Sequence, residues 1–216
     1  MTISGLKTAL IVGATGLVGD ILTHRLVESP AYDRVQVLTR KPLGWQHPRL
    51  QEIPFDFDHP NGLLVRADDI YCCLGTTIKK AGSKEAFRKV DYQYPLDIAR
   101  LGLDNGATQF AIVTAMGADA LSSIFYNQVK GEVERDLMAL SYPTLLVFRP
   151  SLLLGNRSEK RLGERIGSGV MRLFAPLIPA KYKAVEAEKV ATAMLTTMQQ
   201  HHVGHHVFES NDLQEY

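Results

Sequence analysis

Cysteine is scarce in this sequence: Cys72 and Cys73 are the only two among 216 residues, and they are adjacent. Adjacent cysteines can close only a strained ring and cannot link distant parts of a chain. A disulfide framework is therefore excluded, and a reducing compartment is expected. We expect both thiols to pack as small apolar groups, because no basic residue directly flanks them to favour redox chemistry.

Long apolar runs and an excess of charge of one sign are also missing. No stretch approaches the roughly 20 uninterrupted apolar residues of a membrane-spanning helix. The 24 Lys and Arg residues nearly balance the 23 Asp and Glu residues, which argues against a surface that neutralises nucleic-acid phosphates or anionic lipids. The stretch 1–19 is interrupted by glycines, so a buried strand entering a glycine turn explains it better than a signal peptide does. We expect a cytoplasmic protein with no nucleic-acid or membrane partner.

What the sequence does contain is an alternation of short apolar runs with helical patterns. Several runs are apolar on both faces, which is typical of parallel strands covered by helices on each side. The expected strands are 9–12, 35–38, 50–53, 70–73, 110–113, 144–148 and 205–208. This repetition predicts an α/β fold: a Rossmann-like doubly wound, mostly parallel sheet with helices on both faces.

The alternation runs along nearly the whole chain, so we expect 1–216 to form a single domain. It breaks around 155–183, where we expect a small substrate-side insertion; a lid, a dimer surface and plain core remain alternatives for its apolar residues. One helix is expected to begin at Asp91 as its N-cap, with Pro95 early in the helix and Gly106 just past its end.

The most informative stretch is 9–19, ALIVGATGLVG, in which an apolar strand ends at a glycine and a helix begins. Gly13 permits a tight turn, Gly16 lets the backbone approach a pyrophosphate, and Gly19 lets the helix pack closely on the strand. The free N–H groups and the positive end of the helix dipole then face the phosphates. In this context the pattern predicts a dinucleotide site rather than an empty turn.

The end of the second strand distinguishes the two nicotinamide dinucleotides. An acidic residue there grips the ribose 2′-OH of NAD, whereas a basic residue accepts a 2′-phosphate. Asp33 has the right distance from Gly13 in sequence, but it precedes the strand and so belongs to the wrong edge of the sheet. Arg40 and Lys41 follow the strand. We therefore favour NADP(H) over NAD(H), the alternative being that both cations belong to a solvated loop.

Tyr126 and Lys130 form a second candidate site, in the sequence YNQVK on a helix expected to open at Ser122 or Ser123. Their spacing places them on one helix face, one turn apart. A lysine in that position stabilises a phenolate, which suits the tyrosine to act as a general acid in carbonyl reduction. The same spacing occurs by chance on surface helices, but the order of elements favours the catalytic interpretation.

With these motifs the chain resembles the short-chain dehydrogenases/reductases. The matching stretches are GATGLVG at 13–19, YNQVK at 126–130 and RPSLLLG at 149–155. More narrowly, the chain is similar to the compact atypical branch that includes the Tat-interacting oxidoreductase-like proteins and NAD(P)-binding epimerase relatives. The stretches that carry this similarity are CCLGTTIKKAG at 72–82, FRKVDYQYP at 87–95 and MGADALSSIFYNQVKGEVE at 116–134.

The resemblance implies a role for each matching position. The pyrophosphate would be held by the glycine turn, at Gly13, Thr15, Gly16, Leu17 and Gly19. The 2′-phosphate would be held by Arg40 and Lys41, and the adenine would be bordered by Asp56 and Phe57. The ribose and pyrophosphate would be bordered by Leu74, Gly75, Thr76 and Thr77. The nicotinamide end would be bound by Lys130, Pro150, Ser151 and Leu152, and Tyr126 would donate or accept the proton.

One position departs from the family pattern. A serine usually follows the fifth strand and holds the substrate oxygen, whereas this chain has Thr114. Thr114 keeps a hydroxyl that can donate and accept, although its methyl group restricts the side chain. We expect Thr114 to take the place of the serine as the third catalytic residue.

Two functions follow. The first is an NADP(H)-dependent oxidoreductase that transfers hydride to or from a small carbonyl or alcohol substrate, with Tyr126 and Lys130 as the acid/base pair. The alternative is a non-catalytic module that senses a dinucleotide and binds a protein partner. The substrate is an unidentified small molecule in the first case, and a homodimer is compatible with both.

A histidine cluster near the end of the chain is the remaining candidate site. His201, His202, His205 and His206 lie within six residues. No cysteine or carboxylate pattern accompanies them, so we expect a polar turn that enters an edge strand, and no metal.

Overall fold

The computed structural model describes residues 7–155, 182–200 and 202–216. Its centre is a seven-stranded sheet in the order β3-β2-β1-β4-β5-β6-β9, with every neighbouring pair parallel. The strands are β1 (Thr8–Val12), β2 (Arg34–Thr39), β3 (Leu50–Pro54), β4 (Asp69–Cys72), β5 (Gln109–Val113), β6 (Thr144–Arg149) and β9 (Gly204–Glu209). Every strand expected from the sequence is present, and the strand order reverses between β1 and β4.

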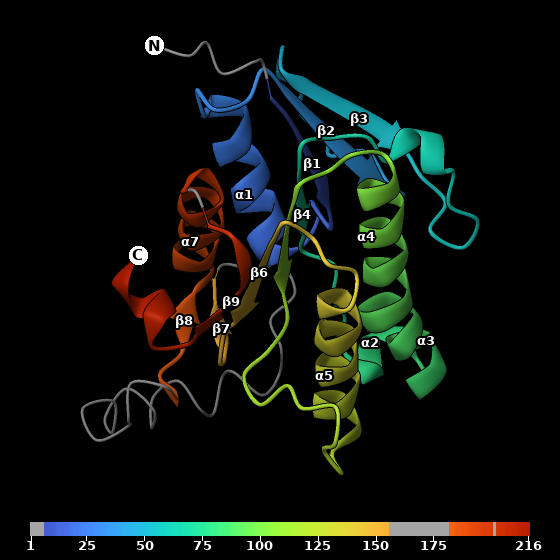
Figure 1. Cartoon of the computed structure of the whole chain (residues 1–216), viewed down its shortest axis with the longest axis vertical. Coiled ribbons are helices and arrows are strands. Elements are labelled where there is room, and N and C mark those ends of the chain that lie inside the picture. Colours follow the sequence, from blue (N-terminus) through green and yellow to red (C-terminus); the bar gives the residue numbers. More distant parts are fainter. Residues whose placement is uncertain (1–6, 156–181, 201) are drawn as a thin grey trace.

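Helices cover both faces of the sheet (Figure 1). On one face α1 (Leu17–Glu28) packs against α7 (Ala187–Gln199). On the other face lie α4 (Tyr94–Asp104) and α5 (Phe125–Met138). Successive residues of a strand point to opposite faces, so each central strand contributes side chains to both layers. The doubly wound α/β fold predicted from the sequence is therefore confirmed.

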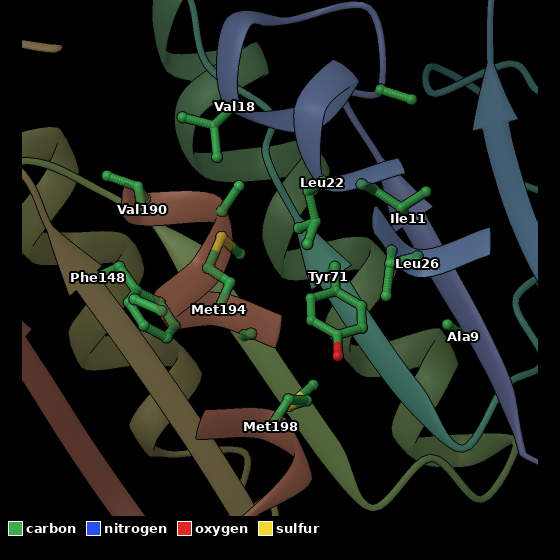
Figure 2. Close-up of a cluster of buried hydrophobic side chains, with 14 of the residues drawn as sticks. Ala9, Ile11, Val18, Leu22, Leu26, Tyr71, Phe148, Val190, Met194 and Met198 are labelled. Carbon is green, nitrogen blue, oxygen red and sulfur yellow. The ribbon is translucent and has the colours of Figure 1, made fainter. Parts of the chain in front are cut away.

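The core on the α1–α7 side holds the start of α1 against the sheet. Leu22 and Leu26 of α1, Met194 of α7, and Ile11 and Tyr71 of the sheet are all fully buried, and Figure 2 shows them converging between the two helices and the strands. Each leucine or isoleucine buried in this way contributes roughly 1.5–3 kcal/mol to the free energy of unfolding. This packing fixes α1 directly after the end of β1.

The helix between β4 and β5 is longer than expected and changes its winding. It comprises α3 (Lys84–Arg88), a π-helical segment η2 (Lys89–Gln93) and α4 without a break. Pro95 supplies a reason, because proline lacks an N–H and its ring clashes with the carbonyl four residues earlier, at Asp91. A widened turn relieves that clash.

The expected N-cap role of Asp91 is therefore wrong. Ser83 caps the helix instead, and its Oγ accepts a hydrogen bond from the backbone N–H of Ala86 at 3.1 Å. Asp91 lies inside the helix and is buried. Gly106 does follow the end of α4 with a φ of +93°, as its predicted role past the helix end requires.

The remaining described elements are short. They are α2 (Ile78–Ala81), the 3₁₀ helices η1 (Gly62–Leu64) and η5 (Asp212–Glu215), and the two-stranded parallel sheet of β7 (Leu153–Leu154) and β8 (Val185–Glu186). The expected insertion around 155–183 falls between β7 and β8, and its residues 156–181 lie outside the described residues. Among the described helices, none is both long enough and apolar enough to cross a membrane.

Candidate functional site

The glycine turn lies where the strand order reverses. Gly13 follows β1 with a φ of +83°, and a Cβ on it would lie 2.5 Å from the carbonyl carbon and oxygen of Cys73. A Cβ on Gly19 would lie 2.2 Å from the carbonyl oxygen of Gly13. Only glycine fits at either position, because a side chain would enter backbone atoms. The tight turn and the close packing of helix on strand, predicted for Gly13 and Gly19, are both confirmed.

The start of α1 presents backbone N–H groups at this edge. Gly16 is the N-cap, its own N–H donates to the Gly13 carbonyl at 2.9 Å, and none of the described side chains caps the helix. Thr15 is exposed in the turn, and Leu17 opens the helix beside Gly155, where an added Cβ would lie 2.6 Å from it. The uncapped N–H groups and the helix dipole suit this edge to an anionic group.

The end of β2 lies beside the glycine turn, and the end of β3 lies one strand further out. Arg40 and Lys41 follow β2 and are exposed, and neither is paired with a carboxylate within the described ranges. Asp33 precedes β2 and its N–H donates to the Lys7 carbonyl at 3.1 Å, so it belongs to the amino edge of the sheet, as expected. Strands rise about 3.3 Å per residue, which separates Asp33 from Arg40 by roughly 20 Å.

After β3, Asp56 is exposed and Phe57 is buried. The Asp56 carboxylate accepts hydrogen bonds from the N–H of Asp58 at 2.8 Å and from the His59 ring at 3.1 Å, and these bonds lower the Asp56 pKa. The Phe57 ring lies against Phe55, with centroids 5.0 Å apart, and against a tyrosine of α4. Phe57 thus forms part of an aromatic floor beside the end of β3.

The loop after β4 connects the glycine turn to the second site. Its Cys73 backbone contacts Gly13, as described above, and Leu74 and Gly75 follow directly. The N–H of Thr76 donates to Asp91 Oδ2 at 2.9 Å. Thr77 caps α2, with its Oγ1 accepting from the N–H of Lys80 at 3.1 Å. The four residues predicted to border ribose and pyrophosphate therefore form one short bridge.

Lys130 is buried on α5 and paired with Asp91. Its Nζ lies 2.7 Å from Asp91 Oδ1, and the exposed fractions of the two side chains are 5% and 0%. Burial disfavours the charge of Lys130, but the Asp91 carboxylate outweighs it and raises the pKa of the ammonium, with a further contribution from Tyr126. Sequence reasoning missed Asp91 as a site residue. Pro95 could have indicated it, because a proline within a helix favours a widened turn at the residue four positions earlier.

Tyr126 lies one turn before Lys130 on the same helix. Its ring packs on the buried Phe87, with centroids 5.5 Å apart, and Phe87 also contacts Phe125. The helix does not open at Ser122 or Ser123 as expected: it begins at Phe125 with Ile124 as N-cap.

Thr114 directly follows β5 and is buried. Its Oγ1 donates to Glu134 Oε1 at 2.5 Å, and Glu134 lies two turns beyond Tyr126 on α5. Glu134 also accepts from Arg149 Nε at 3.1 Å, and Arg149 donates to Glu209 at 2.8 Å. The hydroxyl of Thr114 is thus engaged in a buried network, and Ala115 next to it carries no hydroxyl.

The loop after β6 holds the last predicted cofactor residues. Pro150 is buried, and its carbonyl accepts from the N–H of Met116 at 2.9 Å. The Ser151 hydroxyl donates to the Lys183 carbonyl and accepts from Ser210 at 2.9 Å. Leu152 is exposed. Ser151 therefore joins this loop to the segment that follows the insertion.

The cysteine thiols and the histidine cluster are the two candidates that the sequence argued against. Burial raises the pKa of Cys72 to about 12 and that of Cys73 well above its usual value, which keeps both thiols protonated. The rings of His202 and His206 lie 4.7 Å apart, and His201 lies outside the described residues. Within those residues, no three His, Cys, Asp or Glu side chains are grouped so that they could hold a metal.

A doubly wound parallel sheet with this glycine turn at its switch point, followed by a Tyr–Lys pair on the helix after the fifth strand, defines a protein of the short-chain dehydrogenase/reductase class. No family model matches the chain. Protein HTATIP2 of Rattus norvegicus is 33% identical over 89% of this chain and 81% of its own length. Protein FMP52 of Eremothecium gossypii is 32% identical over 79% of this chain and 76% of its own length. The chain belongs to the family of HTATIP2 and its FMP52 relatives.

Solved structures confirm the fold at low sequence identity. MoeE5 in complex with UDP-glucose and NAD is 14% identical, with a TM-score of 0.72 over 95% of this chain and 79% of that one. The Bordetella bronchiseptica enzyme WbmH in complex with NAD+ is 14% identical, with a TM-score of 0.70 over 95% and 76%.

The expected cytoplasmic location is contradicted by the relatives. The FMP52 proteins of Eremothecium gossypii, Scheffersomyces stipitis and Candida albicans are named as mitochondrial. The expectation rested on the balanced charge of the chain and on the glycines that interrupt its first apolar stretch. Those features bear on surface charge and on the glycine turn, and they do not report the compartment.

Proposed function

We propose that this protein is an NADP(H)-dependent oxidoreductase that transfers hydride to or from a small carbonyl or alcohol substrate. The observation that carries the proposal is the loop 73–76. One end of this loop contacts Gly13 in the glycine turn, and the other donates to Asp91, the partner of Lys130. A phosphate-binding turn and a Tyr–Lys pair joined by so short a bridge suit a dinucleotide that spans both.

The residues present fit a nicotinamide dinucleotide. The glycine turn offers uncapped N–H groups to the pyrophosphate, and Lys130 has its ammonium beneath Gly75 for a ribose. Solved relatives of the same fold contain NAD; here, the exposed Arg40 and Lys41 after β2 favour a 2′-phosphate, and hence NADP(H). When bound, the dinucleotide supplies or accepts the hydride.

The chain would supply the proton and the orientation. Tyr126 would donate its phenolic proton to the developing alkoxide oxygen in reduction, and take it back in oxidation. The charge of Lys130 would stabilise the phenolate left on Tyr126. Phe87, which itself packs on Phe125, would hold the tyrosine ring and exclude water on that side. The partners implied are one small substrate and the coenzyme.

A second candidate is a dinucleotide sensor without turnover. It is favoured by Thr114, whose hydroxyl is engaged by Glu134 and would have to leave a buried network to reach a substrate oxygen. Such a module would bind the coenzyme with the same residues and use it to control a protein partner or a homodimer contact.

Coenzyme binding and turnover separate these two functions. NADPH fluorescence with the purified chain should report binding, and NADPH absorbance across a panel of aldehydes and ketones should report turnover. We expect Tyr126→Phe to abolish turnover while leaving NADPH affinity nearly intact. Binding with no turnover on any panel member would favour the sensor. Absence of binding by any nicotinamide dinucleotide would refute both functions.

A further inference from the structure

We propose that Asp91 is a positioning residue that keeps Lys130 charged and aimed at the coenzyme ribose beneath Gly75. The inference rests on the proposed function and adds a residue to its site. Asp91 would not touch substrate or coenzyme; it would act through the lysine.

The helix geometry aims Asp91 at this point. Asp91 occupies the middle of the π-helical segment η2, four residues before Pro95. π-turns inserted in α-helices often accompany functional sites, since they redirect side chains that a regular helix would place elsewhere. Here the side chain enters the interior and meets Lys130 Nζ at 2.7 Å, although a carboxylate is costly to bury.

Asp91 also ties the lysine to the coenzyme loop. Its Oδ1 faces Lys130, while its Oδ2 accepts from the Thr76 N–H at 2.9 Å. A Cβ built on the exposed Gly75 would lie 3.6 Å from Asp91 Oδ1 and 3.9 Å from Lys130 Nζ, so the ion pair lies directly beneath this loop. Both carboxylate oxygens therefore fix groups that the proposed site uses.

The surroundings of Lys130 leave its charge dependent on Asp91. Among the described residues, the titratable groups that act most strongly on the ammonium are Asp91 from η2, Tyr126 from its own helix and Cys72 from β4. Burial keeps the Cys72 thiol protonated, and burial also opposes the charge of Lys130 itself. Without the aspartate, the effect of burial would outweigh the remaining favourable interactions, and the lysine would release its proton at lower pH than in the native chain.

The first arm of the test needs no coenzyme. Asp91→Asn leaves a buried cation without its carboxylate, and we expect Tm to fall by about 10 °C near neutral pH. A buried lysine with a lowered pKa destabilises the fold most where it is still protonated, so stability recovers as pH rises. The Tm deficit should therefore be larger at about pH 6 than at about pH 9. Adding Lys130→Met should recover part of it.

The second arm asks whether the pair serves the site. NADPH affinity is measured by fluorescence for the native chain and for D91N across the same pH range. We expect the affinity of D91N, relative to the native chain, to weaken by about tenfold as pH rises and Lys130 loses its proton. Asp97→Asn is the matched control, because Asp97 is a carboxylate of the same helix whose hydrogen-bond partner is the exposed Gln93. This variant should change neither arm.

The outcomes separate the proposals. A pH-independent Tm deficit, or no recovery with K130M, overturns the claim that Asp91 sustains the charge. A second outcome is that the Tm deficit follows the expected pH dependence while D91N and the native chain show the same pH dependence of NADPH affinity. That result overturns the positioning role and leaves the proposed function standing. A native chain that binds no NADPH refutes the proposed function and the positioning role together. Should D91N fail to fold, D91N/K130M is compared with K130M, and a double variant less stable than the single one overturns the pairing.

Discussion

Two buried aspartates at opposite edges of the sheet make an instructive comparison. Asp69 begins β4 at the amino edge, and Asp91 lies beyond the carboxyl edge. Asp69 accepts from the Tyr32 hydroxyl at 2.7 Å and from Gln109 at 2.8 Å, and its only cationic partner in the described chain is Lys7, which is partly exposed. Asp91 instead has the buried Lys130 at 2.7 Å.

The neighbouring tyrosines show what that difference means. At the amino edge, burial raises the pKa of Tyr32 and of Tyr71, and the Asp69 charge raises both further. A phenol beside an anion holds its proton, so that network is structural. At the carboxyl edge, the cation paired with Asp91 is Lys130, one helical turn from Tyr126 on α5. The partner of a buried carboxylate, rather than the carboxylate itself, distinguishes this structural network from the one for which we propose a role in chemistry.

The largest expected effect is at the glycine turn, where the backbone at the carboxyl edge leaves no space for a side chain. Gly13→Ala should lower the free energy of unfolding by more than about 3 kcal/mol, because the methyl group would enter the Cys73 backbone at a positive φ. Gly82→Ala is the control, since Gly82 has a φ of +89° but nothing within 4 Å of an added Cβ. Urea denaturation measures both, and equal losses would show that strain alone explains Gly13.

Paired tyrosine variants test the contrast between the two edges directly. Tyr126→Phe should abolish turnover, a loss of at least about 10²–10⁴-fold, with little change in stability, because it removes the proposed general acid. Tyr32→Phe should cost about 1–3 kcal/mol of stability, because it removes a buried hydrogen bond to Asp69. Kinetics and denaturation of both variants give four numbers. A large loss of turnover in Y32F at unchanged stability would contradict the division between edges.

Charge reversal at the end of β2 is expected to have a smaller effect. The double variant Arg40→Glu and Lys41→Glu should weaken NADPH binding by about 10–100-fold, because it removes charge-assisted bonds to a 2′-phosphate. NADH affinity should change far less. Arg34→Glu, at the exposed start of β2 on the amino edge, is the control. Equal weakening of NADPH and NADH would remove the argument for NADP(H).

The smallest effect is expected at the cysteines. Burial raises the pKa of Cys72 to about 12 and holds the Cys73 thiol protonated, so neither should react appreciably with iodoacetamide in the folded chain near pH 8. Mass spectrometry after labelling in buffer and in urea checks this. Rapid native labelling would show that the carboxyl end of β4 opens more readily than the amino edge.

Prediction from the sequence succeeded where local pattern and packing agree. Apolar runs such as 9–12 and 144–148 became parallel strands because nothing in them competes with burial on two faces. The surroundings of Asp91 and Thr114 differ from those that the sequence predicted. Asp91 has the residue type of an N-cap, yet Ser83 and the Pro95 clash moved the helix start and turned Asp91 inward. Thr114 has the hydroxyl of a catalytic residue, yet Glu134, distant in sequence, engages it.

The sequence by itself determined the order of strands and helices, the glycine turn after β1 and the spacing of Tyr126 and Lys130, because each depends on residues within a few positions of one another. Only the tertiary structure decided which charges meet. Asp91 reaches Lys130 from the neighbouring helix of the same layer, and Thr114 at the end of β5 reaches Glu134 on α5. Whether a buried polar group serves chemistry or stability depends on such distant partners, since in a low-dielectric interior the neighbour sets the cost of every charge.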